Sequence, residues 1–126
     1  MTDTILQLDD VSRTFRKDGK LIPVLQNINL SINRLEFICL VGESGCGKTT
    51  TGKILSGLLK PSSGHVRFEG RDVSTLRGND QRQYRRSVQI IHQDPYASLN
   101  PTHTIFDILS FPLFHHRFVR GRNEAR

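Results

Sequence analysis

The stretch that decides the fold is LVGESGCGKTTTGKIL, residues 40–55. It begins with apolar residues, passes through three glycines, and continues at Lys48 with the spacing of an amphipathic helix. Gly42 to Thr49 fits the pattern G-x-x-x-x-G-K-[ST]. Glycines allow a tight turn that directs several backbone N–H groups to one side, and the following helix adds its positive N-terminal end. The stretch therefore predicts a phosphate-binding loop.

Two side chains of this loop are candidates for direct contact with a nucleotide and its magnesium ion. Lys48 supplies a mobile positive charge for the outer phosphates of a nucleotide, and the Thr49 hydroxyl can hold magnesium, which prefers oxygen ligands. Glu43, Ser44 and Cys46 are expected to contribute backbone N–H groups more than side-chain chemistry. The alternative is a chance glycine-rich turn. The apolar run before the loop and the helical pattern after it favour a nucleotide site.

The flanking patterns predict strands and helices. Phe37–Val41 is continuously apolar, as expected of a strand covered on both faces in a parallel sheet. Residues 28–32 alternate with the period of a half-buried strand, and Asp18-Gly19 is a hairpin-turn signal. Further short strands are predicted at 5–11, 65–69 and 88–92. Helices are predicted from Lys48 to Leu59, over 79–87, and over 104–110.

Composition limits the function classes. The chain has 126 residues, the length of one domain, with 36% hydrophobic residues and a formal net charge of +6. Eight of its 13 arginines form two groups: Arg77, Arg82, Arg85 and Arg86, then Arg117, Arg120, Arg122 and Arg126. Neither group is interleaved with aromatic residues as a single-strand nucleic-acid surface would be. We interpret both groups as solvated surface and expect no nucleic-acid partner.

Cysteines, histidines and apolar runs lead us to expect a soluble chain. Cys39 and Cys46 are interpreted as free thiols, and the five histidines show no metal-ligand spacing. No signal peptide is recognised, and no apolar run approaches the about 20 residues of a membrane-spanning helix. We expect a cytoplasmic protein with no transmembrane segment of its own.

Five segments together resemble a known family: LDDVSRTF, VLQNINLSI, VGESGCGKTT, GLLKPSSGHVRFEGRDV and VQIIHQDPYASLNP. Residues 5 to 114 are similar to the N-terminal half of the ATP-binding subunit of an ATP-binding cassette (ABC) transporter. The last segment is similar to the oligopeptide, dipeptide and nickel importer branch. The resemblance implies a subunit that couples ATP hydrolysis to the uptake of peptides or metal chelates.

The resemblance assigns roles to single residues. Phe15 would stack on the adenine ring, and Gln93 would reach magnesium and the attacking water. The nucleotide-binding set, with ATP and magnesium as cofactors, is then Phe15, Gly42, Glu43, Ser44, Gly45, Cys46, Gly47, Lys48, Thr49 and Thr50, with Thr49 and Gln93 as the magnesium ligands. Two alternatives stay open: Phe15 as a core aromatic, and Gln93 as a strand cap. A turn and a helix surface explain Asp94 and Asp107 better than catalysis does.

The family also implies a fold and partners. The expected fold class is α/β, a P-loop NTPase core with an N-terminal antiparallel β-subdomain, truncated before the later core strands. Residues 1–93 would form that part, and residues 94–126 the start of a helical subdomain with an Arg-rich tail. The implied partners are membrane permease subunits and a second ATP-binding subunit, at the inner face of the cell membrane.

Part of the family's catalytic machinery has no counterpart in these 126 residues. There is no LSGGQ-like signature, and no apolar run followed by Asp-Glu, so the second magnesium ligand and the catalytic glutamate are missing. Hydrolysis by this chain is therefore an open question; we expect weak nucleotide binding, little or no turnover and marginal stability. The alternatives are a stand-alone nucleotide-binding regulatory module and, disfavoured by the Gln93 segment, a small P-loop kinase.

Overall fold

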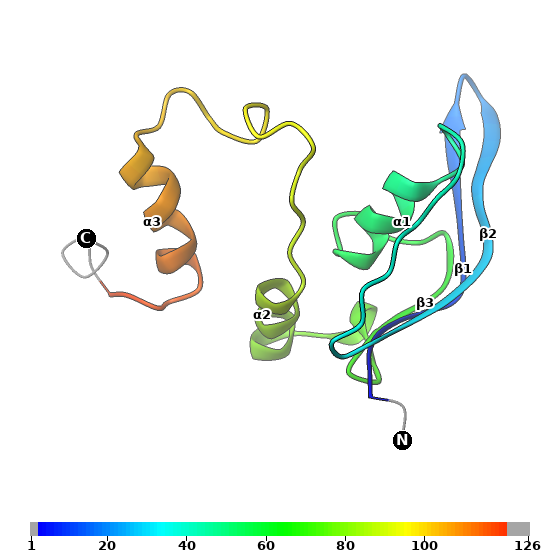
Figure 1. Cartoon of the computed structure of the whole chain (residues 1–126), viewed down its shortest axis with the longest axis horizontal. Helices are drawn as coiled ribbons and strands as arrows, with labels where there is room; N and C mark the ends of the chain where they lie inside the picture. The colour runs from blue at the N-terminus through cyan, green and yellow to red at the C-terminus, as the bar shows by residue number, and fades with distance from the viewer. Residues whose placement is uncertain (1–2, 121–126) are drawn as a thin grey trace. The chain divides into compact units, whose positions relative to one another are not determined.

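The computed structural model describes residues 3–120, so Arg122 and Arg126 of the predicted basic tail lie outside it. Its sheet has the strand order β2-β1-β3-β4; Figure 1 labels β1, β2 and β3. The strands are β1 (Thr4–Lys17), β2 (Lys20–Asn33), β3 (Ser63–Phe68) and β4 (Arg71–Asp72). Each neighbouring pair is antiparallel. The predicted strands near the N-terminus, at 28–32 and at 65–69 are confirmed, as is the antiparallel β-subdomain.

A two-residue turn joins β1 to β2. Asp18 and Gly19 have φ angles of 51° and 75°, and Lys17 pairs directly with Lys20. Positive φ at both central residues is the signature of a type I′ turn, whose twist matches that of the two strands it connects. The Asp-Gly prediction is confirmed. This turn sets the register at the tip of the hairpin, and register shifts along β1 change the pairing toward its far end.

The chain forms two compact units, and the first ends at Ile90. The core of this first unit lies between the sheet and two helices, α1 (Lys48–Leu55) and α2 (Gly78–Ser87). Alternate residues of the strands point inward, because successive side chains of a strand face opposite sides. Ile54 of α1 and Tyr84 of α2 complete the cluster. The buried hydrophobic residues are Leu6, Leu8, Val11, Leu25, Ile54, Val66, Phe68, Leu76 and Tyr84.

Tyr84 joins the two helices to the sheet. Its hydroxyl donates a hydrogen bond of 2.7 Å to the carbonyl oxygen of Leu55, the last residue of α1. Its ring lies against Phe68 of β3 with centroids 5.4 Å apart. Burial raises the pKa of Tyr84 to about 12, because the phenolate would lose water. The prediction of a helix over 79–87 is confirmed, and Tyr84 is the buried residue that anchors this polar helix.

The first helix is shorter than its apolar spacing predicts. α1 ends at Leu55, and Gly57 follows in the left-handed region with φ 74°. Leu58 is exposed. The prediction that the helix continues through Leu58 and Leu59 is therefore wrong. A glycine just after the last helical turn is a common stop signal, and here it outweighs the apolar periodicity.

A second compact unit begins at Ile91 and contains α3 (Ile105–His115). Thr104 and Asp107 form a capping box: the Asp107 N–H donates to the Thr104 hydroxyl at 3.2 Å, and the Thr104 N–H donates to the Asp107 carboxylate at 3.2 Å. The predicted helix is confirmed and extends further than residue 110. Asp107 is thus a capping residue, as its expected place on a helix suggests. The domain boundary expected at residue 93 stays a prediction.

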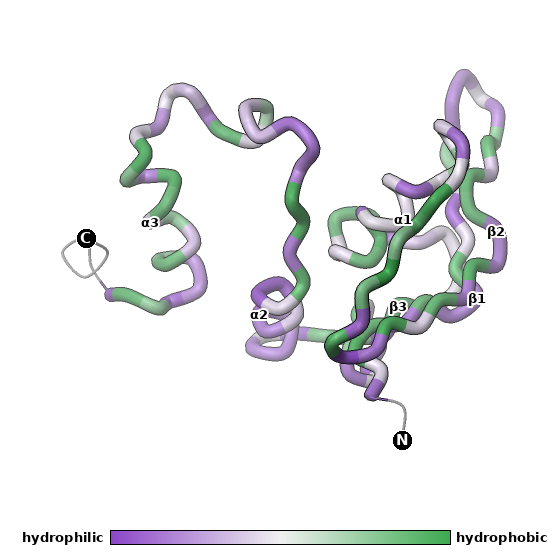
Figure 2. The backbone as a smooth tube through the Cα atoms, in the orientation of Figure 1, coloured by the Kyte–Doolittle hydropathy of each residue, from purple (hydrophilic) through white to green (hydrophobic). Residues whose placement is uncertain are grey.

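Two predicted strands are wrong. Phe37–Val41 and Val88–His92 form no strand, and the exposed fractions of Phe37, Val41 and Ile91 are 92%, 85% and 96%. Figure 2 shows the apolar character of the segment between β2 and α1. A strand of a parallel sheet needs neighbours to satisfy its N–H and C=O groups, and no strand within residues 3–120 pairs with either segment. A continuous apolar run predicts burial, but it does not supply the partner.

The structure also bears on membranes and metals. In the part of the chain that is described, no helix has the length and apolar character needed to cross a bilayer. The same residues contain no group of three or more His, Cys, Asp or Glu side chains placed to hold a metal ion. Cys39 and Cys46 are free thiols, as predicted.

Candidate phosphate-binding site

The glycine loop lies directly against the hairpin. Gly47 precedes α1 as its N-cap with φ 100°. Residues other than glycine rarely adopt this backbone conformation. A β-carbon at Gly47 would come within 2.5 Å of Leu25 Cδ2 and 3.2 Å of the Val24 carbonyl oxygen, both on β2. Glycine is therefore required here for two reasons: the backbone angle, and the close approach of the loop to the sheet.

The start of α1 offers unpaired donors. Its first backbone bond runs from the Thr51 N–H to the Gly47 carbonyl oxygen at 2.9 Å, so the N–H groups from Gly47 to Thr50 have no partner within the helix. No side chain caps this end, and no acidic residue lies in the first turn. An uncapped helix N-terminus carries partial positive charge and binds anions. The donor set that a phosphate requires is thus in place.

Lys48 is bound to the loop's own acceptors. Its ammonium donates to the carbonyl oxygens of Gly42 and Glu43, each at 2.7 Å, and approaches Cys46 Sγ at 3.4 Å. These three contacts match the three protons of an ammonium group. They keep the cation inside the loop, beside the free N–H groups of α1. The loop is closed around Lys48, so the predicted phosphate binding would require the ammonium to leave these carbonyl oxygens.

Two of these acceptors were not foreseen from the sequence. Glu43 and Cys46 were expected to supply N–H groups, yet the Glu43 carbonyl oxygen and the Cys46 sulfur both receive the ammonium. The Cys46 N–H itself donates to the Glu43 carbonyl oxygen at 3.3 Å, which closes a turn inside the loop. Sequence spacing identifies a lysine beside a glycine loop, but it carries no signal for the resting position of a flexible side chain.

The predicted magnesium ligands, Thr49 and Gln93, offer oxygen atoms, which magnesium prefers. Thr49 follows Lys48 in the first turn of α1 and is exposed. Magnesium in phosphate sites takes one or two protein oxygens, and water and phosphate oxygens supply the rest. A hydroxyl at this place, next to the phosphate donors, satisfies that requirement. The roles of Thr49 and Gln93 as ligands stay predictions.

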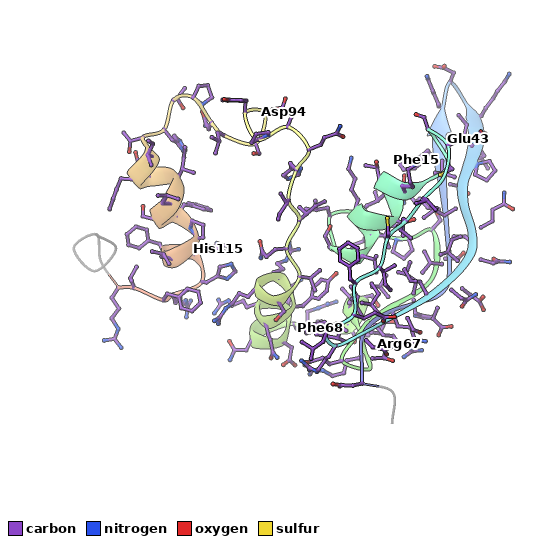
Figure 3. All side chains as sticks on the ribbon, in the orientation of Figure 1. Phe15, Glu43, Arg67, Phe68, Asp94 and His115 are labelled. Carbon is purple, nitrogen blue, oxygen red and sulfur yellow. The ribbon has the colours of Figure 1, made fainter. Side chains whose placement is uncertain are left out.

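Phe15 lies on β1 near the turn of the hairpin, opposite Ile22, and is partly exposed. The Arg13 guanidinium carbon lies 4.7 Å from the centroid of its ring. In the register, Arg13 pairs with Leu25, the residue that Gly47 touches. Phe15 is two residues further along, about 7 Å at the rise of a strand. Figure 3 labels Phe15 and Glu43 beside the same end of the hairpin. The stacking role of Phe15 stays a prediction.

Gln93 belongs to the second unit, in an exposed segment without regular structure. The carboxylate of the next residue, Asp94, accepts from the N–H groups of Tyr96 at 2.9 Å and Ala97 at 3.3 Å. Asp94 therefore stabilises a turn, which agrees with its interpretation from the sequence. The role of Gln93 stays a prediction.

Known proteins resemble this chain in sequence and in fold. The family model described as ABC transporter matches residues 25–125. The chain belongs to the ABC transporter family. Among solved structures, the dimeric ATP-binding cassette MJ0796 in a post-hydrolysis state with ADP and Pi superimposes with a TM-score of 0.74 at 28% identity, over 96% of this chain and 54% of that one. The predicted family and the predicted P-loop NTPase fold are confirmed.

Curated members of the ABC transporter family extend beyond the matched region. A putative peptide import ATP-binding protein of Brucella ovis is 41% identical over 110 residues, which is 86% of this chain and 35% of that protein. The oligopeptide transport ATP-binding protein AppF of Bacillus subtilis is 38% identical over 133 residues, covering 97% and 40%. The chain thus spans well under half the length of these relatives.

Proposed function

We propose that this chain binds ATP as the nucleotide-holding part of the ATP-binding subunit of an ABC importer for peptides. The observation that carries the proposal is the juxtaposition of the Lys48 ammonium with the uncapped N-terminus of α1. A cation and several converging N–H groups suit a ligand with clustered negative charge. The names of the peptide-import relatives support the choice of cargo class.

Each residue of the loop has a distinct part in binding. The N–H groups of Gly47 to Thr50 receive phosphate oxygens, which form short charge-assisted hydrogen bonds. Lys48 turns from the carbonyl oxygens of Gly42 and Glu43 to the outer phosphates. The Thr49 hydroxyl holds magnesium, which neutralises part of the phosphate charge when it is bound. Phe15 offers one aromatic face to the base.

Substitution of Lys48 tests the proposal. Calorimetry of the 126-residue chain with ATP and magnesium should show an affinity at least about ten-fold lower for Lys48→Ala, because a charge that meets the outer phosphates is removed. Lys53→Ala is the matched control, since Lys53 is an exposed lysine in the last turn of the same helix. Equal ATP affinity for wild type and Lys48→Ala would contradict phosphate binding by this loop.

The proposal includes partners at the inner face of the cell membrane. Permease subunits and a second ATP-binding subunit are the expected ones, and the exposed apolar residues of α3, Ile105, Leu109 and Phe111, support a docking role for the second unit. Co-expression with the permease of a peptide importer tests this. Leu109→Asp should reduce the amount of chain recovered with the membranes, while Gln81→Asp on α2 should leave it unchanged.

A second candidate function has one observation in its favour. The exposed apolar segment Phe37–Val41 could pair with another chain, as a stand-alone module that regulates a full-length subunit would require. Addition of the chain to a full-length peptide-importer ATPase discriminates between the two functions. A regulatory module should change the steady-state ATPase rate in proportion to the amount added, and a nucleotide-holding part alone should not.

A further inference from the structure

The side chain of Arg13 links three parts of the candidate site. Its guanidinium carbon lies 4.7 Å from the centroid of the Phe15 ring, and its Nη1 donates to the Lys60 carbonyl oxygen at 2.9 Å. Arg13 and Phe15 lie two apart on β1, so their side chains leave the same face of the sheet. Lys60 lies in the segment that follows α1. One side chain therefore connects the aromatic ring to the segment that follows α1, the helix whose N-terminus belongs to the candidate phosphate site.

The segment after α1 is itself fixed to β1 on both sides of Arg13. The Ser62 N–H donates to the Ser12 carbonyl oxygen at 2.8 Å, and the Thr14 N–H donates to the Ser62 hydroxyl at 3.0 Å. Arg13 lies between these two attachments in the sequence. The carbonyl oxygen that receives its guanidinium is thus held in a defined place, and the guanidinium in turn holds the ring of Phe15.

The placement of Arg13 leaves one of its donors without a hydrogen bond. Arg13 Nε is buried and has no hydrogen-bond partner in the described structure, and an unpaired buried donor is unfavourable. A lysine could reach the same carbonyl oxygen without burying such a donor. What lysine lacks is the planar guanidinium, which stacks on an aromatic face. The geometry of Arg13 is therefore fitted to the ring as well as to the carbonyl oxygen.

We propose that Arg13 is a positioning residue for the base of the nucleotide: it covers one face of Phe15 and fixes the ring so that the opposite face receives adenine. The inference rests on the proposed function, because it presupposes a nucleotide at the loop. A ring held in advance loses less conformational entropy when the base stacks. The cation on one face also draws π-electron density from the other, which favours stacking with an electron-rich purine.

The competing explanation is a clamp that stabilises the fold alone. A clamp would affect every ligand of the loop equally, whereas a positioning residue affects only ligands that carry a base. Two probes separate these cases: ATP with magnesium, and inorganic tripolyphosphate with magnesium, which has the phosphates without the base. Arg13→Met removes the cation and keeps most of the apolar stem.

In calorimetry of the 126-residue chain, Arg13→Met should bind ATP about five-fold more weakly and tripolyphosphate with unchanged affinity. Arg13→Lys, which keeps a cation, should lose less than Arg13→Met. Combined with Phe15→Leu, Arg13→Met should cause no further loss for ATP, because the ring through which it acts is gone. Arg67→Met is the matched control: Arg67 is a partly buried arginine of the same sheet that pairs with Asp9 at 3.4 Å, and neither affinity should change.

Three results would overturn the inference: equal loss for both probes, no loss for ATP, or an Arg13 effect that persists without the Phe15 ring. If circular dichroism shows that Arg13→Met does not fold, the comparison of Arg13→Lys in the presence and absence of Phe15 decides instead. Failure of the proposed function looks different, because Lys48→Ala would then leave the affinity for both probes unchanged. Loss of both affinities in Lys48→Ala with no effect of Arg13 would reject the positioning role alone.

Discussion

Leu25 of β2 fills the space that a side chain on Gly47 would need: Leu25 Cδ2 lies 2.5 Å from the position of a β-carbon there. The antiparallel sheet and the phosphate loop are therefore in direct contact. We expect a change in this contact to alter the start of α1, which carries the N–H groups predicted to bind phosphate.

Gly47→Ala is expected to destabilise the fold by about 2 to 4 kcal/mol, because it combines strain at φ 100° with a steric clash against Leu25. Urea unfolding followed by circular dichroism measures this change. Gly52→Ala is the control. A β-carbon at Gly52 meets no atom within 4 Å, so the helix should gain about 0.5 to 1 kcal/mol. Equal stability of wild type and Gly47→Ala would show that the loop is not held against β2.

Tyr84 is expected to make the first unit less stable as the pH rises into the alkaline range. Its folded-state pKa is raised to about 12, above the value near 10 of an unfolded tyrosine. The unfolded chain therefore releases the phenolic proton first, and the free energy of unfolding falls as pH rises from about 10 to 12. The free energy of unfolding at pH 8, 10 and 11 should decrease for wild type.

Tyr84→Phe provides the comparison for this pH effect. It removes the hydrogen bond to the Leu55 carbonyl oxygen and should cost about 1 kcal/mol at pH 8, with a weaker decline toward pH 11. Tyr96→Phe should match wild type throughout, because Tyr96 is exposed. A decline of the same size in Tyr84→Phe would assign the pH effect to other groups.

The apolar segment Phe37–Val41 is expected to drive self-association. Its exposed residues present unpaired backbone groups together with apolar side chains, a combination that promotes edge-to-edge pairing. Phe37→Ser combined with Val41→Thr should lower the aggregated fraction several-fold in light scattering at equal concentration. Leu58→Ser, at an isolated exposed leucine, is the control. Unchanged aggregation in the double variant would place the association elsewhere.

Local signals in the sequence predicted local structure well. Asp18-Gly19 specified a turn that needs positive φ at both positions, and both residues adopt it. The glycine and lysine spacing of 42–49 specified the loop and the start of α1, because both depend on backbone geometry within a few residues. The same holds for the strands near the N-terminus and for the polar helix α2.

Features that depend on distant partners could not be predicted in this way. The run Phe37–Val41 has the composition of a buried strand, but a strand forms only where neighbours accept its hydrogen bonds. The placement of Arg13 over Phe15 needs the segment around Lys60, 47 residues further along the chain. Spacing of two on a strand indicates that both side chains share a face, yet nothing local indicates that they touch.

The contacts of Lys48 have a consequence for ligand choice. Because two carbonyl oxygens already accept hydrogen bonds from its ammonium, we expect a singly charged ion such as chloride to gain little by entering the loop. A chain of phosphates can compensate for both lost carbonyl contacts at once while its remaining oxygens reach the amides of α1. We therefore expect the contacts of Lys48 to favour polyanions over small anions.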